Sequence, residues 1–323
     1  MNIDPHDGLR DAPSTASPGR LKTYLQLVRI PNVFTALADV TMGYLLTHES
    51  LAPWSVFAAL AVASACLYMA GIVLNDVFDA DVDARERPER PIPSGRVSLR
   101  RARWLGIELL AIGVASGWLA SALSGQVACG VVATLLAIAV VAYDAVLKRT
   151  SLGPLAMGSC RFLNVLLGAS AAAAMWHQVH WSVAAGLGTY IAGVTWFARG
   201  EAEVSRRPQL VFALMVMLAG MALLAALPGF ADEQLAEVSR WRLSTTSWVL
   251  LIGLLGANIG WRCLQAILDP VPAKVQTAVK LSILSLIVLD GAVTLAVREP
   301  VWAVGVLALL VPAALLGTVI YST

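Results

Sequence analysis

Residues 54–74 read WSVFAALAVASACLYMAGIVL, and residues 75–83 continue as NDVFDADVD. The first segment carries no charge and is long enough to cross a bilayer as an α-helix, which takes about 20 residues. The second segment carries four carboxylates within eight residues. This junction predicts a transmembrane helix that ends in an acidic site at the membrane surface.

Apolar windows of the same length recur along the whole chain, which has 323 residues. Ten windows lie near 29–48, 54–76, 104–124, 126–147, 153–175, 181–198, 209–230, 247–268, 278–297 and 300–321. The chain is only 14% charged, against about 25% in a soluble domain, and this excludes a soluble globular protein. We therefore expect an all-α polytopic membrane protein, a bundle of nine or ten transmembrane helices, with nine if one of the last two windows is re-entrant.

The distribution of basic residues predicts the orientation of these helices. Of the 23 Lys and Arg residues, 19 fall in the N-terminal segment and the even-numbered loops, three in the odd-numbered loops, and Arg161 inside a span. Basic residues gather on the cytosolic side of membrane proteins. We expect a cytosolic N-terminus, a disordered cytosolic tail over residues 1–20, and a single transmembrane domain over 21–323, in the bacterial inner (cytoplasmic) membrane.

The acidic segment after the second window has a spacing that suits a cation site. Asn75, Asp79 and Asp83 lie four residues apart, which predicts one face of a helix that continues out of the membrane, with Asp76 on a neighbouring part of that face. Carboxylate and amide oxygens suit Mg²⁺, which takes one or two carboxylates together with substrate phosphate oxygens. A solvated acidic loop is the plain alternative.

This segment, continued by Arg90-Pro91-Ile92-Pro93-Ser94-Gly95, resembles the first aspartate-rich signature of the UbiA superfamily of intramembrane prenyltransferases. Three further stretches are similar to that family: RIPN at 29–32, YDAVLKR at 143–149 and GSCRFLN at 158–164. The resemblance implies Mg²⁺-dependent transfer of a prenyl group from an isoprenyl diphosphate to an acceptor. It implies membrane lipid as surroundings and no nucleic-acid partner.

The resemblance also implies roles for individual residues. Asn75, Asp79 and Asp83 would be catalytic and, with Asp76, would hold the metal. The diphosphate would be bound by Arg29, Lys148, Arg149 and Arg161, and the pocket would be lined by Asn32, Tyr143 and Asn164. Arg29, Lys148 and Arg149 could instead be membrane-surface anchors. Arg161 could instead be a structural partner of Asp39 or Asp290, because a charge inside a span usually faces a partner within the bundle.

The family's second aspartate motif is altered in this chain. The expected position, near 195–207, reads TWFARGEAEVSRR, where Glu201 and Glu203 are the only acids. Residues two apart do not share a helix face, so these two glutamates would complete the metal site from a loop or asymmetrically. This departure resembles the EboC-type branch of the superfamily.

Other functions stay open at the level of sequence. Phosphoribosyl transfer from a sugar diphosphate to a polyprenyl phosphate would use the same acidic site. A transporter, a channel or a lipid-binding protein is the non-enzymatic alternative, although the acids cluster at one membrane face rather than at mid-membrane. The signature of CDP-alcohol phosphotransferases is absent from the sequence. The acceptor and the prenyl length are not encoded in any motif that we recognise.

Overall fold

A computed structural model describes residues 19–173, 177–199, 205–229 and 241–321, and every regular element in these ranges is helical. The α-helices of the first half are α1 (Arg20–Leu27), α2 (Ile30–Thr47), α3 (Trp54–Phe78), α4 (Ala80–Glu86), α5 (Leu99–Ser124), α6 (Ala128–Ala145) and α7 (Gly153–Ala169). A 3₁₀ turn, η1 (Leu147–Arg149), joins α6 to α7. The second half contains α8 (Gln178–Ala198), α9 (Arg207–Ala225), α11 (Thr245–Leu268), α12 (Pro272–Val297), α13 (Pro300–Ala308) and α14 (Leu310–Tyr321).

Each of the ten predicted windows corresponds to one long helix or, for the last window, to the α13–α14 pair. Seven of these, within the described ranges, are long and apolar enough to cross a membrane: α3, α5, α6, α9, α11, α12 and the α13–α14 pair. The other three are α2, α7 and α8. They are shorter or more polar, since they place Asp39, Arg161 and His180 on buried faces. The prediction of an all-α, multi-pass membrane protein is confirmed.

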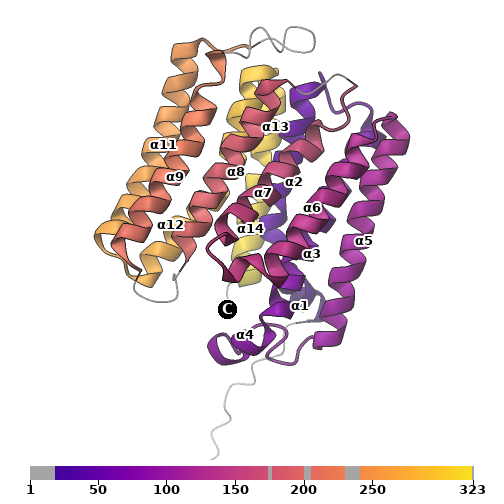
Figure 1. Cartoon of the computed structure of the whole chain (residues 1–323), viewed down its shortest axis with the longest axis vertical. Coiled ribbons are helices and arrows are strands. Elements are labelled where there is room, and N and C mark those ends of the chain that lie inside the picture. Colours follow the sequence, from indigo (N-terminus) through magenta and orange to yellow (C-terminus); the bar gives the residue numbers. More distant parts are fainter. Residues whose placement is uncertain (1–18, 174–176, 200–204, 230–240, 322–323) are drawn as a thin grey trace, which may run out of the picture.

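The helices form an elongated bundle (Figure 1). In the view of Figure 1, α9, α11 and α12 lie on the left, α3, α5 and α6 lie on the right, and α2, α7 and α8 lie between them. Helices α1 and α4 and the end of α14 lie at the lower end, where Gln26 Nε2 donates to the carbonyl of Ile320 at 3.0 Å. The outer faces carry exposed apolar side chains such as Phe212 and Leu254, as lipid-facing surfaces do.

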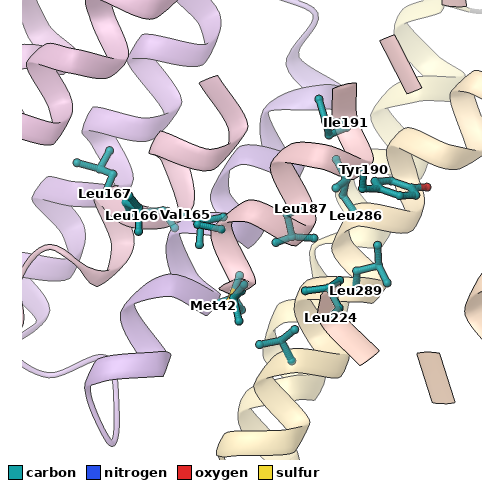
Figure 2. Packing of buried hydrophobic residues seen from close by; sticks show 14 of the residues in the cluster. Met42, Val165, Leu166, Leu167, Leu187, Tyr190, Ile191, Leu224, Leu286 and Leu289 are labelled. Carbon is teal, nitrogen blue, oxygen red and sulfur yellow. The ribbon is translucent and has the colours of Figure 1, made fainter. Parts of the chain in front are cut away.

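Close packing of small and aliphatic residues holds the central helices together. Figure 2 shows Met42, Val165 and Leu187 in the buried cluster that α2, α7 and α8 share. At the crossing of α7 and α8, a Cβ added to Gly158 would meet the carbonyl oxygen of Gly188 at 2.5 Å. Lipid does not drive apolar helices together as water does, so such close approach is a principal source of helix association.

Three breaks in the helices place the polar side chains at the lower end of the bundle. Helix α3 ends at Phe78 and α4 begins at Ala80. The prediction of one continuous helix through Asp83 is therefore wrong, because the helix is interrupted at Asp79. Arg29 joins α1 to α2 with a left-handed backbone, at φ 45°. The chain leaves α6 at Ala145 and turns through η1 before α7 starts. The predicted tail lies outside the described residues except for its last two, and α1 begins at Arg20.

Candidate active site

A cavity of about 400 Å³ lies between α2, α3, α6, α7, α8 and α12. Its walls are largely apolar and include Leu67, Leu136, Val140, Ile191 and Val194. Its polar lining includes six residues that the sequence predicted for the site: Arg29, Asn32, Asn75, Tyr143, Arg161 and Asn164. The volume falls within the usual range of small-molecule sites, about 300–1,000 Å³.

At the lower end of α3, two of the predicted metal ligands lie against the basic turn η1. Lys148 Nζ donates to Asn75 Oδ1 at 2.9 Å and lies 2.8 Å from Asp79 Oδ2. Arg149 Nη2 lies 3.5 Å from Asp79 Oδ1 and donates to the carbonyl of Phe78 at 3.2 Å. We call Asn75, Asp79, Lys148 and Arg149 the lysine cluster. Asn75 is the member that lines the cavity, so the cluster places ligand oxygens and two cations beside this end of the cavity, which we call its mouth.

Two further predicted metal ligands, Asp76 and Asp83, lie in a separate group. Arg90 Nη1 lies 2.6 Å from Asp83 Oδ2 and 3.4 Å from Asp76 Oδ1, and Arg29 Nη2 lies 3.0 Å from the same oxygen of Asp76. We call Arg29, Arg90, Asp76 and Asp83 the arginine cluster. Both carboxylates in it are buried. The spacing grouped Asp83 with Asn75 and Asp79, whereas the structure joins Asp83 to Asp76 because Arg90 folds back from the loop after α4.

Deeper in the cavity, Arg161 is paired inside the bundle. Its Nη1 donates to Asp39 Oδ2, and its Nη2 donates to Thr35 Oγ1 at 3.2 Å. Asn164 Nδ2 donates to the same Asp39 oxygen at 2.9 Å, and its Oδ1 accepts from Ser64 Oγ at 2.7 Å. Arg161 also lies 5.8 Å from the ring centre of Tyr68. The structural partner that the sequence offered for Arg161 is therefore present, and both residues of the 161–164 pair still line the cavity.

One acidic cavity residue was missed by sequence reasoning. Asp144, on the last turn of α6, lines the cavity and is only 2% exposed. A single acid between Tyr143 and the Leu-Lys-Arg stretch carries no spacing signal. The signal that could have found it is its position, three residues before the end of the otherwise uncharged apolar window 126–147.

The donor set at the mouth fits Mg²⁺ in kind, since it consists of carboxylate and amide oxygens. No group of three or more acidic, His or Cys side chains in the described ranges is arranged to hold a metal by itself. The residues therefore suit a Mg²⁺ ion that shares its coordination with substrate phosphate oxygens. Glu201 and Glu203, the remaining predicted ligands, lie outside the described residues.

The arrangement has a clear chemical capacity. Arg29 lines the cavity, Lys148 and Arg149 supply further positive charge beside Asn75 and Asp79, and the cavity walls are largely apolar. Such a site can hold an amphiphile whose anionic head stays at the membrane surface while its hydrocarbon chain lies among the helices. The same charges can stabilise negative charge that develops on a leaving group.

Comparison with known proteins identifies a family and several relatives. A model described as the UbiA prenyltransferase family matches residues 36–207. The digeranylgeranylglyceryl phosphate synthase of Ignicoccus hospitalis is 40% identical over 160 residues, which are 49% of this chain and 50% of that protein. The same-named protein of Saccharolobus solfataricus is 34% identical over 149 residues, 46% of this chain and 51% of the relative. The chain spans about half the length of the curated relatives it matches.

Solved structures show the same fold. A UbiA homolog from Aeropyrum pernix has a TM-score of 0.60 and 20% identity, and the match covers 81% of this chain and 97% of that one. A UbiA homolog from Archaeoglobus fulgidus, whose structure holds GPP and Mg²⁺, has a TM-score of 0.59 and 15% identity, with coverage of 88% and 99%. At these identities the likeness concerns the fold.

Proposed function

The chain belongs to the UbiA prenyltransferase family, and we propose that it transfers a prenyl group from an isoprenyl diphosphate to an acceptor within the membrane. The observation that carries this proposal is the lysine cluster at the mouth of an apolar-walled cavity. Paired oxygen donors and cations suit a metal–diphosphate head, and the walls suit a hydrocarbon chain. That the Archaeoglobus homolog holds GPP and Mg²⁺ supports the same class of ligand.

In this proposal the residues of the two clusters bind different parts of the donor's metal–diphosphate head. Arg29, Lys148 and Arg149 bind the diphosphate. Asn75 and Asp79 hold Mg²⁺, with Asp76, Asp83 and the undescribed Glu201 and Glu203 as further candidates. When bound, Mg²⁺ supplies Lewis-acid stabilisation of negative charge on the diphosphate oxygens. In the structure the ammonium of Lys148 contacts Asn75 and Asp79. It is therefore positioned to contact the oxygens of a diphosphate bound beside these two residues.

Bond breaking follows from this binding. The cations stabilise departing diphosphate, so that the C1–O bond of the donor ionises toward an allylic cation. Leu67, Leu136, Val140 and the other apolar walls keep water away from that cation until the acceptor attacks.

For the acceptor we propose the hydroxyl group of a glycerol phosphate-type lipid. The support is the name shared by the relatives that are 34–40% identical over about half of this chain, digeranylgeranylglyceryl phosphate synthase. We place the mouth of the cavity on the cytosolic side. The support is the gathering of basic residues in the tail and the even-numbered loops, which include Lys148 and Arg149. The bacterial inner membrane and the EboC-type branch stay predictions.

Ligand-dependent thermal stability tests the donor site. The purified chain in detergent should melt at a higher temperature with geranylgeranyl diphosphate and Mg²⁺ together than with either alone. Asp79→Asn should remove this shift, while Asp81→Asn, at an exposed position of the same acidic segment, should retain it. An unchanged shift in Asp79→Asn would contradict the site, and transport of the diphosphate across proteoliposomes would favour the transporter alternative. A shift with phosphoribosyl diphosphate, but none with the prenyl donor, would favour sugar transfer.

A further inference from the structure

Asp144 lines the cavity, and no hydrogen bond or ion pair within the described ranges includes its carboxylate. Its Oδ2 atom is buried and accepts no hydrogen bond from any residue in the described ranges. Asp39, Asp76, Asp79 and Asp83 each form an ion pair, whereas none of the ion pairs in the same ranges includes Asp144. Buried polar groups normally have a hydrogen-bond partner, so a buried carboxylate without one at a cavity indicates a ligand that binds there.

The local fold explains why Asp144 is left without a partner. Lys148 stands four residues after it, the spacing at which a continuing helix would bring the two side chains together. Helix α6 ends at Ala145, however, and η1 turns Lys148 toward α3, where its ammonium binds Asn75 and Asp79. On the facing helix, Gly71 has no side chain, and a Cβ built there would lie 3.9 Å from Asp144 Oδ2. Asp144 and Gly71 both line the cavity, so the carboxylate lies at the cavity wall with no side chain of Gly71 beside it.

The chemistry of a carboxylate restricts what can occupy this position. A diphosphate would be repelled by it, and the cations that suit a diphosphate lie in the lysine cluster and at Arg29. Asp144 is not part of any group in the described ranges that could hold a metal. What remains is a hydrogen-bond donor without negative charge, such as a hydroxyl group.

We propose that the carboxylate of Asp144 accepts the hydrogen bond of the acceptor's hydroxyl group and takes its proton during prenyl transfer. This inference rests on the proposed function. In the step, the hydroxyl oxygen forms a bond to C1 of the prenyl chain and the C1–O bond to diphosphate breaks. The electron pair of that bond leaves with diphosphate, and the hydroxyl proton passes to Asp144. Asp144 is then a catalytic residue on the acceptor's side of the cavity, separate from the groups that hold the donor.

The test compares the wild-type chain with Asp144→Asn, and uses Asp81→Asn as the control. Each protein is given Mg²⁺, geranylgeranyl diphosphate and geranylgeranylglyceryl phosphate, and two quantities are measured: the donor-dependent shift in melting temperature and the rate of ether formation. We expect Asp144→Asn to keep the donor-dependent shift and to lose transfer by about 100-fold or more, the usual range for a lost general base. Asp81→Asn should match the wild type in both measurements.

The melting temperature without ligand shows whether the variant folds. Because Asn replaces a carboxylate whose Oδ2 has no partner, Asp144→Asn should melt at or above the wild-type temperature. Formate should restore part of the transfer rate in Asp144→Ala, since it can supply the missing base, and a purely structural role would give no rescue.

Two results would overturn the assignment. Wild-type transfer in Asp144→Asn would show that no proton goes to this residue, and loss of the donor-dependent shift would place Asp144 in the donor or metal site instead. A wild-type chain that shows neither the shift nor transfer would refute the proposed function itself, and this inference with it.

Discussion

The Arg161–Asp39 pair gives the sharpest test of how the interior of the bundle is stabilised. Asp39 is 0% exposed and Arg161 is 8% exposed, and Arg161→Met would leave the carboxylate of Asp39 buried without its cation. Breaking one side of a buried ion pair costs about 3–5 kcal/mol. An unfolding entropy of about 2.1 cal/mol/K per residue amounts to roughly 0.68 kcal/mol/K over a chain of this length, so the melting temperature should fall by about 4–7 °C.

The double variant Arg161→Met/Asp39→Asn removes both charges and keeps an oxygen for the amide of Asn164. It should melt at a higher temperature than Arg161→Met alone, because the uncompensated charge is gone. Differential scanning fluorimetry of the four proteins in one detergent gives the coupling energy directly. Strictly additive losses would refute the reasoning. A double variant that regains stability but not the shift produced by geranylgeranyl diphosphate and Mg²⁺ would show that Arg161 also binds the donor.

Three further predictions concern other contacts. Arg90→Met leaves the buried Asp83 without its ion-pair partner, and Asp76 with Arg29 alone, so it should lower the melting temperature by several degrees. Lys274→Met, at an exposed pair, should change the melting temperature by a degree or less, and equal effects of the two variants would contradict the assignment. Gly158→Leu should prevent the close approach of α7 and α8 and reduce the yield of folded protein. Gly253→Leu should be tolerated, because a Cβ added at Gly253 has no heavy atom within 4 Å. Similar yields of the two variants would contradict the role of the α7–α8 contact. Burial, with Arg298 nearby, lowers the pKa of His48 below 6.5. As the pH falls, His48 therefore takes up a proton in the unfolded chain before it does so in the folded chain, and the free energy of unfolding should decrease as the pH drops through 6.5. If the difference in melting temperature between wild type and His48→Asn is the same at pH 7.5 and pH 5.5, this prediction is contradicted.

The sequence was most informative about the helices. Transmembrane helices are recognised in a sequence as runs of about 20 apolar residues. All ten windows form helices. In lipid, only a helix or a closed β-barrel satisfies all of its backbone hydrogen bonds. The break at Asp79 was not predictable in this way. The i,i+4 backbone bonds from Asp79 to Asn75 and from Asp83 to Asp79 are present on both sides of it, so local pattern alone favours one continuous helix.

The pairing of charges was the part that sequence could not supply. Spacing along one segment groups residues on a helix face, whereas Arg90 reaches Asp76 and Asp83 from a loop that folds back. Arg161 meets Asp39 across 122 residues of chain, and which of its two offered partners it binds depends on how α2 and α7 pack. The isolated position of Asp144 depends on where α6 ends and where η1 directs Lys148, and both are results of tertiary structure.

The distance along the chain between Asp39 and Arg161 also has a consequence for membrane insertion during synthesis. Asp39 enters the membrane with the first long helix, and the residue that neutralises it is synthesised 122 residues later. At about 5–20 residues per second, this delay is roughly 6–24 s. For that time α2 carries an acid whose insertion costs about 2.5 kcal/mol or more. The other apolar residues of α2 have to offset this cost until α7 arrives and Arg161 pairs with Asp39.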